Sequence, residues 1–401
     1  PVCWFAIEAR LAADQVSVEG FASTVSRFKV AFPSRAAPAQ YSFQHVPITA
    51  GAFPRGTEHD MAKYLAYCDS IVHDPHVRTL MRFACFSILE QVSYTRKDGQ
   101  YLRWDHRSPR DRVRGRFDKG PIPTFKDAIS TKLDRMVDDL KENGFHEHLR
   151  ASVESLELHR GSSLEILPTL PARSVDLIVT SPPYCNRYDY TRTYALELAF
   201  LHCAEGDIKQ LRQRLLSCTV ENKDKIEQLR DIYREHKSKR FDHIQEVFEE
   251  QSALQEVLRL LDTRALDGSL NNVNVPRMVR NYFREMCFII AEMARIVRPG
   301  GTVAMVNDNV RYAGEEVPVD LILSDFARSF GFHIHRIWAL PRGKGNSSQQ
   351  MGTHGRSELR KCVYVWTRNP RPVSIAVVQP QGERVHGKRM WRRQQPARCL
   401  D

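Results

Sequence analysis

Apolar and polar positions follow two different periods along the chain, and each period predicts a different kind of element. Residues 175–179 are apolar except for Asp176 and rich in β-branched side chains, which predicts a short buried strand. Between residues 58 and 92, and again between residues 205 and 264, apolar side chains recur at helical spacing. The second of these stretches is highly charged, and we expect it to form an antiparallel helical hairpin inserted into the fold.

The expected strand is followed by the run Thr180-Ser181-Pro182-Pro183-Tyr184, which we call the lip. Two consecutive prolines cannot donate hydrogen bonds to a sheet, so the backbone must leave the sheet there in a stiff, extended form. Ligands of open α/β sheets bind at the carboxyl ends of parallel strands, which is where the lip is expected. It offers a hydroxyl group, carbonyl groups without competing N–H groups, and an aromatic ring.

These groups suit the methylation of an exocyclic base amine. Such an amine is a poor nucleophile because its lone pair is delocalised into the ring. Ser181 Oγ and a lip carbonyl can hold its two hydrogens and aim the lone pair at a methyl donor, while Tyr184 stacks on a flipped-out base. Base–aromatic stacking is worth roughly 1–3 kcal/mol, comparable to the cost of flipping. A plain Pro-Pro turn with a surface tyrosine is the alternative.

Residues 176–184, together with the segment that runs on to Leu198, resemble the catalytic motif of the amino-methylating DNA methyltransferases. The resemblance implies a Rossmann-like enzyme that uses S-adenosylmethionine. In that family the first motif position is usually Asp or Asn in adenine N6 enzymes and Ser in many cytosine N4 enzymes. Ser181 therefore favours cytosine N4.

Three further segments resemble other parts of that fold. Residues 160–171 resemble the strand–loop–helix element before the catalytic strand, and residues 294–306 resemble a helix, a turn and the fifth strand. Residues 332–340 and 361–367 resemble the closing hairpin. The resemblance implies an α/β fold: a Rossmann-like methyltransferase sheet, parallel with an antiparallel closing hairpin, that carries helical insertions.

Two departures from the family concern the cofactor. Ser162 replaces the usual acidic residue after Gly161, and we find no glycine-rich F-x-G-x-G loop. Residues 2–8 read as a strand ending in Glu8, where Rossmann enzymes place the acid that binds the cofactor ribose, although an edge strand with a solvated Glu is the alternative. Only seven residues precede Glu8, so the chain looks cut between the first and second strands. The cofactor contacts that we expect are Ile7, Glu8, Ser162 and Thr180.

The composition favours a partner that is a polyanion. The chain carries 59 Lys and Arg against 48 Asp and Glu, a net charge of +11, which indicates nucleic acid. No apolar run approaches the ~20 residues that a bilayer requires, and no signal peptide is visible, so we expect a cytoplasmic protein, nucleoid-associated if bacterial. The nine cysteines are scattered and the H-x-H pairs lack a third ligand, so no metal site is expected. Cys185 follows Tyr184 rather than a proline, and we expect it only to pack.

Basic and aromatic residues interleave in residues 93–105, around the turn signal Asp98-Gly99. Arg and Lys can bind phosphates there while Tyr and Trp stack on bases. Residues 341–356 combine glycines with basic and amide side chains in a loop that is long for a hairpin. A solvated loop is the plain alternative in both places. The DNA contacts that we expect are Arg96, Lys97, Tyr101, Arg103, Trp104, Asn186, Arg187, Tyr188, Arg192, Arg342, Lys344 and Asn346.

The sequence thus predicts a site-specific DNA methyltransferase of a restriction-modification type, acting on cytosine N4 with Ser181, Pro182, Pro183 and Tyr184 as catalytic residues. An adenine N6 enzyme, an RNA base methyltransferase and a non-catalytic DNA-binding remnant are alternatives. A homodimer, or a partner bound through the helical insertion, is left open. The expected organisation is a sheet start at 1–30, a mostly helical insertion with the recognition segment at 31–157, the catalytic strand and lip at 158–202, the charged hairpin at 203–271, the second half of the sheet at 272–368 and a basic tail at 369–401.

Overall fold

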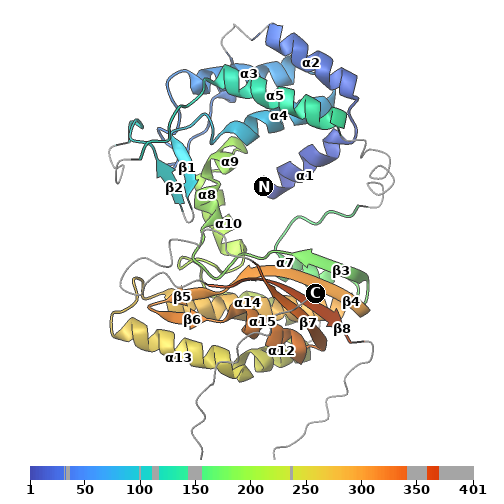
Figure 1. Cartoon of the computed structure of the whole chain (residues 1–401), viewed down its shortest axis with the longest axis vertical. Helices are drawn as coiled ribbons and strands as arrows, with labels where there is room; N and C mark the ends of the chain where they lie inside the picture. Colours follow the sequence, from blue (N-terminus) through green and yellow to red (C-terminus); the bar gives the residue numbers. More distant parts are fainter. Residues whose placement is uncertain are drawn as a thin grey trace, which may run out of the picture.

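The structure is a computed structural model that describes residues 1–369, apart from residues 31, 33–36, 99–100, 111–116, 143–155, 235–237 and 341–358. The described residues form two lobes, a helical lobe and a sheet lobe, drawn above and below in Figure 1. Arg342, Lys344 and Asn346, three of the expected DNA contacts, lie outside the described residues, as does the tail beyond residue 369.

The helical lobe has its own apolar core. Its buried side chains include Phe28, Tyr64 and Phe125, and the Tyr64 hydroxyl donates to the carbonyl oxygen of Met81 at 2.8 Å. The helix α4 (Pro75–Ile88) in this lobe has a capped start, because the Asp74 side chain accepts hydrogen bonds from backbone N–H groups of its first turn. The elements are α1 (Val2–Ala13), α2 (Val18–Val30), η1 (Ala39–Tyr41), α3 (Thr57–Ile71), α4 (Pro75–Ile88), the hairpin β1 (Thr95–Asp98) and β2 (Tyr101–Trp104), and α5 (Phe125–Glu142).

The strand predicted at residues 2–8 is wrong, because these residues form the first half of α1. A short continuous apolar run fits either a buried strand or a buried helix, and the alanines that follow it favour a helix. α1 packs on α4, where the rings of Phe5 and Phe86 lie 5.2 Å apart. Glu8 therefore does not end a strand of the sheet.

The sheet lobe holds a four-stranded mixed sheet in the order β3-β4-β8-β7. β3 and β4 run parallel, and both pairs that involve β8 are antiparallel. The predicted α/β class is thus confirmed as a mixed sheet with helices, and the two strands of the expected closing hairpin are present. The strands are β3 (Val175–Thr180), β4 (Val297–Asp308), β7 (Phe332–Ala339) and β8 (Lys361–Arg368), beside a separate small pair, β5 (Val310–Tyr312) and β6 (Glu315–Val317).

Helices cover one face of this sheet, which we call the closed face. α14 (Val275–Ile296) and α15 (Val319–Ser329) lie against it, below the strands in Figure 1. Met305 of β4 and Trp366 of β8 are fully buried on this face. The opposite face, the open face, carries exposed apolar side chains, and Leu177 and Val179 of β3 are 58% and 74% exposed. β3 was predicted correctly as a strand but wrongly as a buried one.

Within its described residues, the charged stretch at 205–264 forms four helices rather than the predicted hairpin of two. One of the boundaries between these helices is set by a capping side chain rather than by a glycine. The Gln251 side chain accepts a hydrogen bond from the backbone N–H of Leu254, and a new helix begins there. Tyr233 and Leu258 are buried in the same core as α14, so this stretch packs on the sheet lobe. The helices are α10 (Glu205–Arg214), α11 (Ile226–Arg234), α12 (Ser238–Glu250) and α13 (Ser252–Leu266).

Two smaller expectations also differ. Residues 156–162 form no strand, and Ser162 instead caps the short helix α7 (Ser163–Ile166), which is followed by η2 (Leu167–Thr169). The turn expected between the helix and the fifth strand lies inside β4, where Gly300 has a positive φ of 82°. A Cβ atom at Gly301 would lie 2.7 Å from the carbonyl oxygen of Asp176, so glycine permits the close approach of β3.

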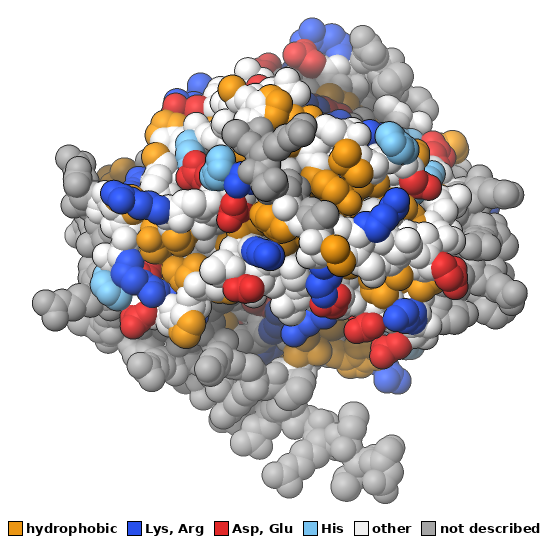
Figure 2. Space-filling model, turned by 90° about the horizontal axis from the view of Figure 1, so that it is seen from above, with side chains coloured by type: hydrophobic (Ala, Val, Ile, Leu, Met, Phe, Trp, Pro, Cys, Tyr) orange, Lys and Arg blue, Asp and Glu red, His pale blue; other side chains and the backbone are white. Residues whose placement is uncertain are grey.

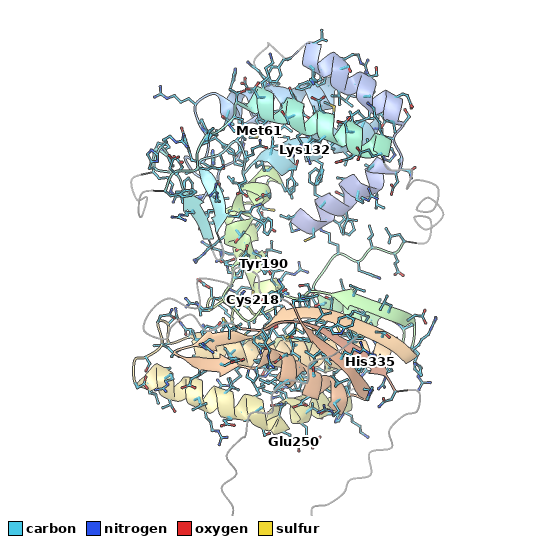
Figure 3. The ribbon with its side chains drawn as sticks, viewed as in Figure 1. Met61, Lys132, Tyr190, Cys218, Glu250 and His335 are labelled. Carbon is cyan, nitrogen blue, oxygen red and sulfur yellow. The ribbon has the colours of Figure 1, made fainter. Side chains whose placement is uncertain are left out.

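The chain passes from the lip into the helical lobe through α8 (Tyr190–Thr193) and α9 (Ala195–Phe200). Tyr190 and Cys218 lie at this junction between the lobes (Figure 3). Among the described helices, none is long and apolar enough to cross a membrane.

A candidate active site at the carboxyl end of β3

The lip brings the predicted catalytic residues into one turn at the end of β3. Ser181 Oγ lies 3.3 Å from the Tyr184 hydroxyl oxygen, so the two prolines between them fold the chain back on itself. Ser181 is exposed, whereas Pro182, Pro183 and Tyr184 are half-buried. A hydroxyl group and an aromatic ring are therefore available at the same point of the surface.

The residues after the lip anchor it to the sheet lobe. Cys185 is fully buried and its carbonyl oxygen accepts from the hydroxyl of Tyr312 at 2.6 Å. Burial raises the pKa of the Cys185 thiol, which keeps the thiol protonated and unreactive. The packing role predicted for Cys185 is confirmed. Arg187, with a positive φ of 66°, turns the chain, and its guanidinium donates to Asn271 Oδ1 at 2.8 Å.

The other expected DNA contacts after the lip are held by local partners. Asn186 is buried and its side-chain oxygen accepts from the backbone N–H of Tyr188. The ring of Tyr188 lies 4.7 Å from that of Tyr190. Arg192 pairs with Asp189 at 3.2 Å and with Glu221 at 2.9 Å. These contacts fix the conformation of the segment that follows the lip. Arg192 must give up an acidic partner before it can bind a phosphate.

Three polar residues next to the lip were missed at the sequence level. Asn307 and Asp308 end β4, and Lys361 begins β8. The Lys361 ammonium nitrogen lies 5.8 Å from the centroid of the Tyr184 ring, within reach of a cation–π contact. A polar triplet, Asn307-Asp308-Asn309, directly after an apolar strand was the available signal, because carboxyl ends of parallel strands gather ligand-binding side chains.

The residues predicted to bind the cofactor are not brought together. Ile7 and Glu8 lie on α1 in the helical lobe, where the Glu8 carboxylate accepts from the Trp4 indole N–H. Thr180 ends β3 in the sheet lobe, and Ser162 is occupied as a helix cap that accepts from the N–H of Leu164. The prediction of Ile7 and Glu8 as contacts depended on a strand that is not formed. These four residues therefore do not form one S-adenosylmethionine site.

The β1–β2 hairpin carries basic side chains on aromatic supports. The guanidinium groups of Arg96 and Arg103 lie 5.1 and 4.4 Å from the centroid of the Phe117 ring. Arg96 and Arg103 are exposed at the surface of the hairpin. Arg110 lies over the ring of Trp104 at 4.3 Å. The side chain of Tyr101 is not described.

Lys97 of the same hairpin differs, because its ammonium group donates to the buried carboxylate of Glu197 and lies 4.4 Å from the Tyr194 ring centroid. It ties the hairpin to α9. Because their side chains are exposed and that of Lys97 is half-buried, Arg96 and Arg103 are better placed than Lys97 for a phosphate.

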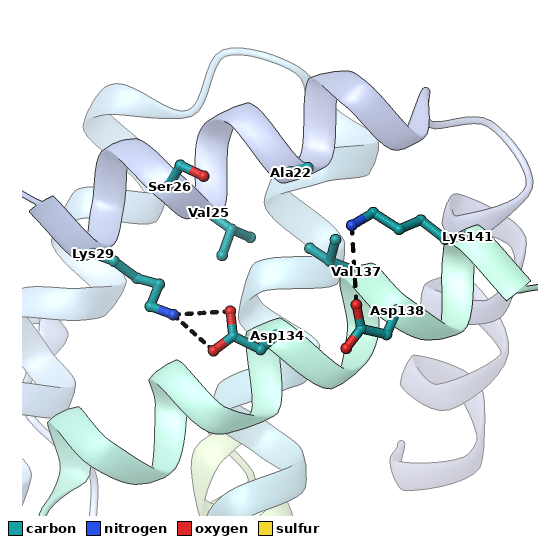
Figure 4. A pocket seen from close by; sticks show the side chains of 8 residues that line it. All are labelled: Ala22, Val25, Ser26, Lys29, Asp134, Val137, Asp138 and Lys141. Atoms are coloured by element: carbon teal, nitrogen blue, oxygen red, sulfur yellow. Dashed lines mark hydrogen bonds and ion pairs between the residues drawn. The ribbon is translucent and has the colours of Figure 1, made fainter.

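The described residues at the end of the molecule formed by the helical lobe do not gather positive charge. On the face shown in Figure 2, basic and acidic side chains are interspersed. A hollow of about 360 Å³ between α2 and α5 is also unsuited to an anion, because its Lys29 pairs with Asp134 at 2.7 Å and its Lys141 with Asp138 at 4.0 Å (Figure 4). The lip is the better candidate for the site.

No protein-family profile matches the chain. Over 327 residues, 80% of this chain and 64% of the relative, it is 46% identical to the type II methyltransferase M.AvaI of Nostoc sp. and, with the same values, of Anabaena variabilis. It is 42% identical over 343 residues to the type II methyltransferase M.BsoBI of Geobacillus stearothermophilus, covering 82% of this chain and 67% of the relative. The chain therefore spans about two thirds of the length of these curated relatives.

Among solved structures, a protein of Thermus thermophilus provisionally named a DNA modification methylase aligns over 53% of each chain, at 16% identity and a TM-score of 0.22. A likeness this low carries no argument about fold or function.

Proposed function

The chain belongs to the type II methyltransferases, and we propose that it methylates an exocyclic amine of a DNA base, with cytosine N4 as the target. The observation that carries this proposal is the pairing of Ser181 with Tyr184 in one turn at the end of β3, with 3.3 Å between their oxygens. The names of the relatives, type II methyltransferases at 42–46% identity, support the same class of reaction.

In this proposal Tyr184 stacks on a base that has left the double helix. The ring is half-buried and its chain segment is fixed by Cys185, so little conformational entropy is lost when a base binds. Ser181 accepts one amine hydrogen and a carbonyl of the lip accepts the other, which directs the nitrogen lone pair outward. Positioning of this kind can supply roughly 7–11 kcal/mol of a barrier, so the site does not depend on a strong base.

The preference for cytosine N4 over adenine N6 follows from Ser181 in the first position of the motif. We also propose that the sheet is Rossmann-like. The parallel pair β3–β4 and the antiparallel hairpin β7–β8 support this assignment. Arg96 and Arg103, exposed on the β1–β2 hairpin, are the phosphate contacts that we favour.

We propose S-adenosylmethionine as the methyl donor, on the ground of family membership. Of the four predicted cofactor contacts, only Thr180 lies at the end of a sheet strand where such a donor is expected to bind. This observation favours one second candidate, a protein that binds DNA and leaves the base unmodified.

Mass spectrometry of digested nucleosides tests the proposal. The chain is incubated with S-adenosylmethionine and either unmethylated plasmid DNA or RNA. We expect N4-methylcytosine from DNA and no methylated base from RNA. N6-methyladenine would replace the base assignment, a methylated RNA base would replace DNA as the substrate, and DNA binding without any methylated nucleoside would favour the second candidate.

A further inference from the structure

Asp308 lies near the lip, to which its strand partner Lys361 relates it. It is the last residue of β4 and lies directly opposite Lys361 in the antiparallel pairing with β8. Side chains that are opposite one another in such a pair approach closely. The Lys361 ammonium nitrogen is 5.8 Å from the Tyr184 ring centroid, and the Tyr184 hydroxyl is 3.3 Å from Ser181 Oγ. The carboxyl group of Asp308 therefore belongs to the surroundings of the lip.

The alternation of side chains along β4 places Asp308 on the open face. Its neighbour Asn307 is buried on the closed face, where its amide donates to the Tyr282 hydroxyl at 2.8 Å. Successive side chains of a strand point to opposite faces. In the parallel register Thr180 lies opposite Met305, so Asp308 lies beyond the point where β3 ends and Ser181 begins the lip.

One oxygen of this carboxyl group lacks a hydrogen-bond partner. Asp308 Oδ1 is buried, and no group of the described residues donates to it. Burial raises the pKa of Asp308, while the charge of Lys361 lowers it. A buried acceptor without a donor is unfavourable, and a bound donor would remove that cost. The chain thus holds a buried acceptor without a donor at the end of β4, opposite the lysine that lies over the Tyr184 ring.

We propose that Asp308 reads the exocyclic amine of the captured base: its Oδ1, in place of the lip carbonyl, accepts the second amine hydrogen while Ser181 accepts the first and the base stacks on Tyr184. The inference rests on the proposed function and names a second residue, besides Ser181, that selects the substrate. Cytosine N4 and adenine N6 both present N–H donors at this position. A carbonyl group in the same place, as in uracil, presents only lone pairs, which a carboxylate repels. Asp308 therefore distinguishes amine-bearing bases before any methyl group is transferred.

Binding to short single strands tests this inference without a methyl donor. Fluorescence anisotropy gives the affinity of the full chain for strands of deoxycytidine and of deoxyuridine, and for strands of deoxyadenosine and of its purine analogue without the N6 amine. We expect the amine-bearing strand of at least one pair to bind about tenfold more tightly, the value of one hydrogen bond to a charged group. Asp308→Asn keeps the shape and loses the charge, and Asp308→Ala removes the acceptor. Asp308→Ala should abolish most of the preference, Asp308→Asn should reduce it because an uncharged amide oxygen is a weaker acceptor, and both should leave the affinity for the amine-free strand unchanged.

Asp176→Asn is the matched control. Its carboxylate lies near the other end of β3, where it pairs with Arg298 at 2.8 Å, so this variant should keep the preference of the parent. If Asp308 were only structural, its variants would lower the melting temperature and weaken both strands of a pair equally, and an unchanged preference would overturn the inference. Binding that still depends on Tyr184 would then leave the proposed function intact. A parent chain that binds no strand would overturn both.

Discussion

The two faces of the four-stranded sheet are built from the same strands but have different tasks. On the closed face Val303, Met305, Tyr364 and Trp366 are fully buried under the helices. On the open face Val179 is 74% exposed and its neighbours on β4 and β8 are only half-buried. Successive residues of one strand thus differ completely in their surroundings, because side chains alternate between the faces.

This difference indicates where stability and where binding reside. The closed face joins the sheet to α14, α15 and the helices of residues 226–266 in one apolar core. The open face contributes less buried apolar area. The lip, Asp308 and Lys361 nevertheless all lie at the edge of the sheet where β3 and β4 end. Substitutions on the two faces should therefore separate folding from function.

The largest effect is expected from Trp366→Ala. Its ring is fully buried on the closed face, and deleting a buried aromatic side chain usually costs about 3–5 kcal/mol of the free energy of unfolding. Urea denaturation followed by circular dichroism measures it. Trp338→Ala on the neighbouring strand is the control, because Trp338 is 50% exposed on the open face and should lose far less. Equal losses would contradict the distinction between the faces.

Ser181→Ala should lower the methylation rate by roughly a hundredfold, the usual effect of losing one group that orients the reacting atom. The free energy of unfolding and the affinity for DNA should remain close to those of the parent, because Ser181 is exposed. Single-turnover methylation and DNA titration give the two quantities. Ser174→Ala, at the other end of the same strand, is the control and should leave the rate unchanged. A normal rate with weakened DNA binding would remove Ser181 from the reaction.

Tyr184→Ala should weaken base capture by about tenfold, since stacking on an aromatic side chain contributes roughly 1–3 kcal/mol per base. Tyr184→Phe keeps the ring and loses only the contact with Ser181 Oγ, so it should retain most of the capture. The fluorescence of 2-aminopurine at the target position reports the flipped base. If the alanine variant and the parent gave the same signal, stacking on Tyr184 would be excluded.

Val179→Thr should have the smallest effect, within about 0.5 kcal/mol of the parent in urea denaturation, as is usual for exposed positions. Its counterpart on the closed face is Val303→Thr, which places a hydroxyl group in the fully buried core and should be clearly destabilising. A large loss at Val179 would mean that the open face is covered in solution.

The local sequence was sufficient to predict the lip and the helical character of residues 58–92 and 205–264. Ser181 and Tyr184 lie together because of the two prolines between them, which is a property of five consecutive residues. The burial of β3 could not be predicted in this way, since it depends on what packs against Leu177 and Val179. The prediction of a strand at residues 2–8 failed for another reason. A run of seven residues is too short for the spacing of its apolar side chains to distinguish a strand from a helix.

Asp308 was missed for a third reason. Its place beside the lip depends on the register of β4 against β3 and β8, which joins segments more than fifty residues apart in the chain. No local pattern encodes that register. The cofactor site and the residues at 341–358 stay predictions.

The outer edge of β3 has one further consequence. In the sheet order β3 is a terminal strand, and within the described residues no strand pairs with its other side. In a parallel pair only every second residue directs its N–H group toward the neighbouring strand. Amide hydrogen exchange along Val175–Thr180 should therefore alternate between slow and fast positions, whereas β4, which is paired on both sides, should be protected more evenly. A strand with such an edge can also pair with a strand of another chain. The exposed apolar side chains of Leu177 and Val179 would then pack against that chain.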